Sequence, residues 1–175
     1  MNGEPILVLT TGGTIDKNYF DALSAYQIVE SGIPALLAAA RVTLAHRVEE
    51  VCRKDSLDLT DADRAEIARC VAAAPEARIV ITHGTDTMTD TARVLAKAAP
   101  GKTVVLTGAL SPARFAETDA PFNLGMAFAA AQIAPPGVYI AMSGALFDGL
   151  KVRKDRAAGQ FIALPDSAAD PRDQG

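Results

Sequence analysis

The sequence predicts an α/β protein with a mainly parallel sheet that helices cover on both faces. Two observations support this prediction. Five short apolar or β-branched segments recur along the chain, and segments with helical patterns lie between them. These short segments are apolar at consecutive positions, which is typical of parallel strands buried on both faces. The predicted strands are Ile6–Thr10, Val42–His46, Arg78–Thr82, Thr103–Thr107 and Val138–Met142.

Helix-start signals precede most of the segments between these strands. The signals are a Ser or Thr followed three residues later by a polar side chain that can complete a capping box, or a proline at the first helical position. They occur at Ser24–Gln27, Pro34, Thr60–Asp63 and Thr87–Asp90, and "APFNLGMAFAAAQIA" (120–134) supplies the last helix. Strands alternating with helices in this way predict a Rossmann- or flavodoxin-like three-layer sandwich.

The size and composition of the chain describe one folded domain. It has 175 residues, of which 49% are hydrophobic and 22% are charged, so it is not a disordered chain. We expect a single domain over residues 1–160. The last stretch, residues 161–175, is predicted to be an extended tail that frays at its end.

Several function classes are disfavoured by composition. A net charge of −4 argues against a nucleic-acid partner. The longest apolar run, Ile33–Ala40, is too short to cross a membrane, and "MNGEPILVL" lacks the features of a secretory signal, so we expect a cytoplasmic protein. Cys52 and Cys70 do not make a disulfide framework, and the two histidines have no metal-ligand spacing, so no metal is predicted.

Glycines and hydroxyls follow three of the predicted strands. "TTGGT" follows the first strand, "HGTDT" (83–87) the third and "TGALSP" (107–112) the fourth. A tight turn explains any one of these loops. However, the carboxyl ends of parallel strands meet at one edge of a sheet, where ligands bind in α/β proteins. Three such loops at one edge therefore indicate a site.

The first of these loops presents a hydroxyl more readily than it cradles a phosphate. It matches neither of the glycine-rich nucleotide-binding patterns, and no helix start follows Thr14. A threonine hydroxyl needs a group that takes its proton, and the candidates nearby are Asp16, Lys17 and Tyr19.

The second loop offers further chemistry. Thr85 and Asp86 supply a hydroxyl and a carboxylate, to which a lysine could couple. His83 also allows a Ser–His–Asp arrangement with Ser111 and Asp86, although a histidine at a strand end can simply be packed there.

The segments "TGGTID" and "ITHGTDTMTDTA", in this order and spacing, resemble the two signature segments of the L-asparaginase family. Four further segments extend the resemblance over nearly the whole chain: "DSLDLTDAD", "LTGALSP", "DAPFNL" and "DGLKVRK". The resemblance implies an amidohydrolase that converts L-asparagine to L-aspartate and ammonia without a cofactor or metal.

The resemblance also implies the catalytic residues. Thr14 corresponds to the nucleophile that accepts the acyl group, and Tyr19 to the tyrosine that assists it. Thr85, Asp86 and Lys154 correspond to a second hydroxyl–carboxylate–lysine group. A solvent-exposed basic segment is the alternative for Lys154.

The implied substrate-binding residues lie in the same loops. Ser56 falls where a serine holds the α-carboxylate of the substrate, and Asp86 where the α-amine is held. Gly13, Asp55 and Gly84 complete the implied binding set. In contrast, Leu57 replaces a polar residue that touches the substrate in many members. We expect a short-chain form that resembles the first of the two domains usual in the family.

Three expectations accompany this interpretation. The segment Asp16–Asp21 is predicted to be a mobile lid that carries Tyr19; the alternative is an ordered connection with a packed tyrosine. A homo-oligomer, at least a dimer, is expected because the face that a second domain would cover is exposed. The alternative functions are a deamidase of glutamine or another small amide, and a non-catalytic amino-acid-binding domain.

Overall fold

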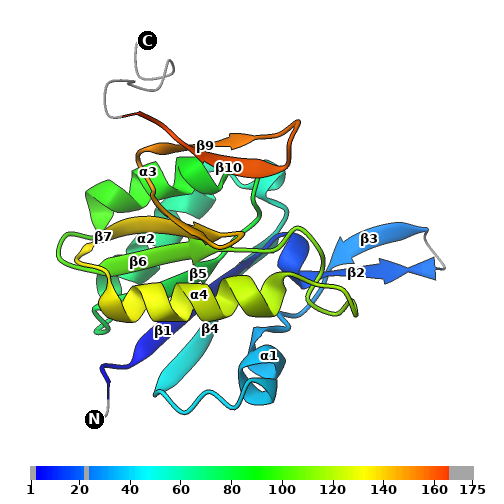
Figure 1. Cartoon of the computed structure of the whole chain (residues 1–175), viewed down its shortest axis with the longest axis horizontal. Coiled ribbons are helices and arrows are strands. Elements are labelled where there is room, and N and C mark those ends of the chain that lie inside the picture. The colour runs from blue at the N-terminus through cyan, green and yellow to red at the C-terminus, as the bar shows by residue number, and fades with distance from the viewer. Residues whose placement is uncertain (1–2, 22–23, 166–175) are drawn as a thin grey trace.

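The computed structural model describes residues 3–21 and 24–165. Within these ranges the chain folds around a six-stranded sheet with the order β4-β1-β5-β6-β7-β8 (Figure 1). Neighbouring strands are parallel from β4 to β7, and β8 is antiparallel to β7. The strands are β1 (Ile6–Gly12), β4 (His46–Lys54), β5 (Arg78–Thr82), β6 (Thr103–Thr107), β7 (Gly137–Met142) and β8 (Ala145–Asp148). The predicted α/β class is confirmed.

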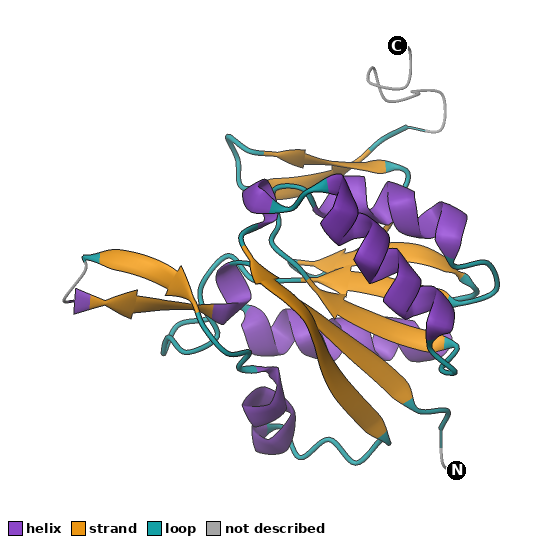
Figure 2. Ribbon diagram, turned by 180° about the vertical axis from the view of Figure 1, so that it is seen from behind, coloured by secondary structure: helices purple, strands orange, loops and turns teal. Residues whose placement is uncertain are grey.

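Helices cover both faces of this sheet, as predicted. α1 (Ile33–Ala39) and α4 (Ala120–Ile133) pack on one face, and α2 (Asp61–Ala73) and α3 (Met88–Ala98) pack on the other (Figure 2). Successive side chains of β1 point to opposite faces of the sheet and so belong to two different hydrophobic cores. Ile6 and Val8 pack on the α1/α4 side, and Leu7 and Leu9 pack on the α2/α3 side. Burying each such side chain contributes roughly 1.5–3 kcal/mol.

Two sequence predictions about local structure are wrong. The second strand starts at His46, not Val42, because Val42 and Leu44 instead pack against the α1/α4 core. The strand itself has charged residues at five of its nine positions, which is typical of an edge strand and gives a weak apolar signal. The helix predicted after Ser24 is the strand β3 (Ala25–Ile28), since this segment pairs with β2 (Lys17–Phe20) in an antiparallel hairpin.

The helix-start signal at Thr60 is confirmed. The Thr60 hydroxyl accepts a hydrogen bond from the Asp63 backbone N–H at 3.3 Å, and the Asp63 carboxylate accepts one from the Thr60 backbone N–H at 2.8 Å. Pro34 lies in the first turn of α1, as predicted. Thr87 is the N-cap of α3, but its hydroxyl accepts no capping bond and instead donates to the Ser56 carbonyl.

Two hairpins lie outside the main sheet. The β2/β3 hairpin projects from one side of the molecule, and a second hairpin lies beyond α3 (Figure 1). The second hairpin comprises β9 (Val152–Asp155) and β10 (Gln160–Ala163), so the chain is still paired where the extended tail was predicted to begin. Residues 166–175 lie outside the described part. No helix in the described ranges is long and apolar enough to span a membrane.

Candidate active site

Loops that follow three strands meet at the carboxyl edge of the sheet. Gly13 follows β1, Ser56 follows β4 and Gly84 follows β5. A Cβ atom built on Gly13 would lie 2.4 Å from the Gly84 backbone nitrogen, and one built on Gly84 would lie 2.6 Å from Ser56 Oγ. Only glycine permits such close approach of two backbones. The glycines therefore bring the three loops into direct contact.

Thr14 sits at this junction. It begins the 3₁₀ helix η1 (Thr14–Asp16) directly after Gly13, whose φ of 83° suits glycine. The Gly13 backbone N–H donates to the Lys54 carbonyl at 2.9 Å, which ties the loop to the end of β4. The Thr14 side chain is half-buried at the edge of the sheet.

Asp16, one of the candidate bases for Thr14, has a structural role. Its side chain is buried and accepts hydrogen bonds from Ser31 Oγ at 2.9 Å and from the Gly32 backbone N–H at 3.0 Å. Burial raises the pKa of this carboxyl, and the two hydrogen bonds only partly oppose that effect. Asp16 therefore anchors the segment after the hairpin.

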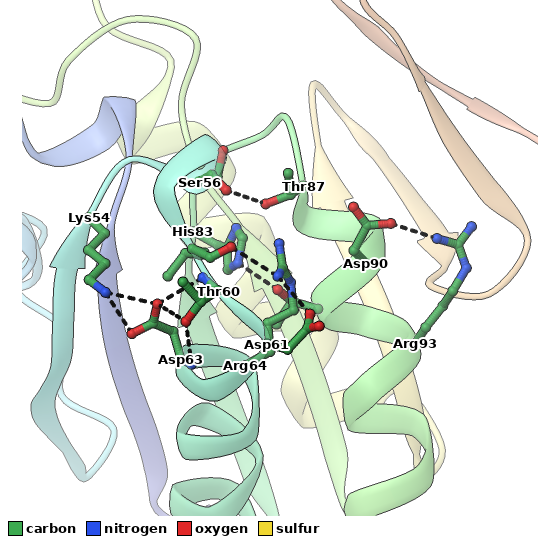
Figure 3. Close-up of polar contacts among 12 residues, drawn as sticks. Lys54, Ser56, Thr60, Asp61, Asp63, Arg64, His83, Thr87, Asp90 and Arg93 are labelled. Carbon is green, nitrogen blue, oxygen red and sulfur yellow. Dashed lines mark hydrogen bonds and ion pairs between the residues drawn. The ribbon is translucent and has the colours of Figure 1, made fainter. Parts of the chain in front are cut away.

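Ser56 lies in the 3₁₀ helix η3 (Ser56–Asp58) and is 1% exposed. Among the described residues its hydroxyl has no hydrogen-bond partner. Its backbone carbonyl accepts a hydrogen bond from Thr87 Oγ1 at 2.7 Å, which joins the turn to the start of α3 (Figure 3). A buried hydroxyl without a protein partner, next to a glycine contact, is available to a ligand.

Asp55 caps η3. Its carboxylate accepts from the Leu57 backbone N–H at 3.1 Å and forms an ion pair with Lys17 Nζ at 2.7 Å. Burial raises the pKa of Asp55, but Lys17 and the Leu57 N–H outweigh burial, so the pKa lies below its ordinary value. Asp55 is therefore an ionised residue that holds the turn in place.

Lys154 joins the second loop. Its ammonium group donates to Thr85 Oγ1 and to Asp86 Oδ1, both at 2.6 Å. The Lys154 side chain is 12% exposed, whereas Arg153 and Arg156 are exposed to solvent. The alternative of a solvent-exposed basic segment is therefore wrong for Lys154.

The Ser–His–Asp alternative is also wrong. His83 is fully buried, with Nδ1 2.7 Å from the Gly84 carbonyl and Nε2 2.8 Å from Thr91 Oγ1. Ser111 donates its hydroxyl to the Glu117 carbonyl instead. Burial lowers the pKa of His83 to about 4, so the ring is neutral at pH 7. Its two hydrogen-bond contacts link the loop after β5 to α3.

This neutral histidine predicts a pH dependence of stability. The pKa of His83 falls from 6.5 to about 4 on folding, so the unfolded chain binds up to one more proton between these values. The free energy of unfolding should therefore fall as the pH drops below about 6.5, by up to ~1.4 kcal/mol per pH unit. Urea unfolding of wild type and His83→Gln between pH 5 and pH 8 isolates this contribution. Parallel pH profiles for both proteins would contradict it.

Tyr19 stands apart from the other candidates. It lies in β2, is 43% exposed and packs against Tyr26 of β3, with ring centroids 5.2 Å apart. Among the described residues its phenol makes no hydrogen bond. The segment 16–21 is thus mostly hairpin strand, not loop, and the Tyr19 ring contacts Tyr26 of the same hairpin. The other candidates belong to the sheet-edge loops or bond to them: Gly13, Thr14, Ser56, Gly84, Thr85, Asp86 and Lys154.

Asp119 and Asn123 stabilise the neighbouring loop after β6. Asp119 accepts hydrogen bonds from the Leu110 and Ser111 backbone N–H groups at 3.0 Å, and Asn123 Nδ2 donates to the Gly108 carbonyl at 3.0 Å. Sequence reasoning assigned no role to either residue. The available signal was Asn123 itself, one of two polar side chains in the apolar segment 120–133, and in the fold this side chain is fully buried.

No group of three or more His, Cys, Asp or Glu side chains in the described ranges could hold a metal ion. The family of the chain follows from its similarity to known proteins. A model of the asparaginase N-terminal domain matches residues 5–163. The chain belongs to the asparaginase family.

Individual members support the assignment. The chain is 35% identical to an L-asparaginase of Thermococcus kodakarensis, over 93% of this chain and 52% of the relative. It is 32% identical to L-asparaginase 2 of Escherichia coli, over 85% of this chain and 46% of the relative. The structure of L-asparaginase I from Vibrio cholerae superposes with a TM-score of 0.82 at 29% identity, over 93% and 52%. This asparaginase-family chain thus spans about half the length of the curated relatives it matches.

Proposed function

We propose that this chain hydrolyses L-asparagine to L-aspartate and ammonia, with Thr14 as the nucleophile. The observation that carries the proposal is the Lys154 ammonium, which bonds to Thr85 and Asp86 beside the glycine junction that presents Thr14. A lysine held against a threonine hydroxyl supports proton transfer, and the nearby threonine supports acyl transfer.

In the first step, Thr14 Oγ1 bonds to the side-chain amide carbon of asparagine, and the proton of the Thr14 hydroxyl passes to the amide nitrogen. The negative charge that develops on the amide oxygen is stabilised by backbone N–H groups at the loop edge. The carbon–nitrogen bond then breaks and the nitrogen leaves as ammonia with that proton, which produces an acyl ester on Thr14.

In the second step, water attacks this ester. The Thr85–Lys154–Asp86 group takes a proton from the water and returns one to Thr14 Oγ1, which releases aspartate and restores the enzyme. The buried position of Thr85 and the two 2.6 Å bonds to Lys154 support this role. In this second step the Thr85–Lys154–Asp86 group therefore carries the proton transfer between water and Thr14.

Substrate binding uses the opposite side of the junction. The unpartnered Ser56 hydroxyl donates to the α-carboxylate, and Asp86, whose Oδ1 already binds Lys154, offers Oδ2 to the α-ammonium. Gly13 and Gly84 contribute by letting the three loops pack together, which keeps the binding groups close to one another. The hairpin acts as a lid, and its movement brings Tyr19 to Thr14. The working unit of the enzyme is a homo-oligomer.

An ammonia-release assay with asparagine and glutamine tests the proposal. We expect release from asparagine, with or without EDTA, since the mechanism uses only side chains and water. Release from glutamine alone would favour the alternative of another small-amide deamidase. Binding of asparagine without ammonia release would favour the non-catalytic alternative. Activity that vanishes with EDTA and returns with a divalent ion would contradict the metal-free step.

A further inference from the structure

The β2/β3 hairpin is linked to the body of the molecule by an ion pair at its base. Lys17, the first residue of β2, lies 2.7 Å from Asp55 through Nζ and Oδ2, and each side chain is 27% exposed. The same Asp55 carboxylate caps the turn that begins with Ser56. One carboxylate thus connects the projecting hairpin with the Ser56 turn.

The hairpin face that bears Tyr19 is the face that carries Lys17. Lys17 pairs with Ile28 across the hairpin and Tyr19 pairs with Tyr26. Directly opposed residues, and residues two apart along a strand, share one face. A cleft of about 590 Å³ lies between the hairpin and the η3 turn, and its lining includes Lys17, Tyr26, Gln27 and Ile28 of the hairpin and Asp55, Leu57 and Asp58 at the turn. The ion pair therefore joins the two sides of this cleft, because Lys17 belongs to the hairpin and Asp55 to the η3 turn.

Two other cations of the same cleft are held differently. Arg53 pairs with Glu50 of its own strand at 2.9 Å, and Lys54 pairs with Asp63 of α2 at 2.8 Å. Neither of these two contacts reaches the hairpin. Within the described residues, Lys17–Asp55 is the ion pair that joins the hairpin to the body.

We propose that Lys17 and Asp55 are positioning residues: their ion pair holds the base of the hairpin and the Ser56 turn together and thereby sets the KM for the amide substrate. This inference rests on the proposed function. A Ser56 turn that is held in place binds substrate better than a loose one, and the apparent affinity falls with the fraction of molecules in which the turn is in place. Asp55 then acts through Lys17, not by contact with the substrate.

Four variants test the pair. Lys17→Met removes the cation and keeps the stem, while Asp55→Asn removes the charge and keeps a side chain that can cap η3. A partly exposed ion pair contributes up to about 1 kcal/mol, so each change should raise KM about fivefold with little change in kcat. The double variant should be no worse than either single variant. Lys17→Arg should restore the wild-type KM, and Arg53→Met is the matched control with no effect.

Hydrogen exchange supplies a readout that is independent of catalysis. The amides of residues 17–20 and 25–28 should exchange faster in Lys17→Met and Asp55→Asn, but not in Arg53→Met. Additive effects on KM, or a large effect of Asp55→Asn with none of Lys17→Met, would overturn the proposal and identify Asp55 as a substrate ligand. If the wild type releases no ammonia, the proposed function fails, while unchanged exchange in both variants would overturn the tether itself.

Discussion

Replacing Lys154 by methionine should lower kcat by about a thousandfold and leave the fold intact. Methionine keeps the apolar stem of the side chain but removes the ammonium that bonds to Thr85 and Asp86. Loss of a positioned proton-transfer group typically costs about 10²–10⁴-fold in rate. The measurement is steady-state ammonia release, accompanied by far-UV circular dichroism to verify folding.

The neighbouring arginine supplies the control for this prediction. Arg153 lies on the same strand with its side chain exposed, so Arg153→Met removes a positive charge without touching the Thr85–Asp86 pair. We expect near wild-type turnover for this variant. Similar losses in both variants would show that net charge, not the Lys154 contact, limits the rate.

Replacing Gly13 by alanine should lower the free energy of unfolding by about 3 kcal/mol and abolish activity. The new Cβ would lie 2.4 Å from the Gly84 backbone nitrogen, and backbone cannot rotate away as a side chain does. Overpacking of this kind costs ~1–3 kcal/mol, to which the φ of 83° adds strain. Because Thr14 follows directly, any shift of the loop moves the nucleophile. Urea unfolding and ammonia release measure the two effects.

Gly101 separates the two contributions. Its φ is 79°, close to that of Gly13, but a Cβ built there meets nothing within 4 Å. Gly101→Ala should therefore cost only the backbone strain, about 1 kcal/mol, and keep full activity. Equal destabilisation of the two variants would mean that the close approach of Gly13 to Gly84 contributes nothing to stability.

The strands that sequence reasoning located well are those in the middle of the sheet. β5 and β6 begin and end where the apolar pattern predicts, because both faces of these strands are buried. β4 was misplaced and the β2/β3 hairpin was missed. Both are partly exposed, so their polar residues obscure the pattern, and pairing with another segment decides their structure.

The candidate site divides in the same way. Residue types and their order in the "TGGT" and "HGTD" segments were sufficient to propose Thr14, Thr85 and Asp86 as site residues. Sequence reasoning left His83 open as a catalytic base, since a histidine at a strand end has no pattern that reveals its hydrogen-bond partners. In the fold both ring nitrogens are hydrogen-bonded, one to the Gly84 carbonyl and one to Thr91 Oγ1, so His83 has a structural role in this loop.

Local patterns of burial and conformation are enough to predict the parallel sheet, the glycine-rich loops at its carboxyl edge and the presence of a hydroxyl, a carboxylate and a lysine. The fold is needed to show that Lys154 meets Thr85 from 69 positions away and that Lys17 pairs with Asp55. It is also needed to show that the Ser56 hydroxyl has no partner among the described residues. Such contacts form where distant segments of the chain meet. The packing of the whole core sets those meeting points, so a local sequence pattern does not reveal them.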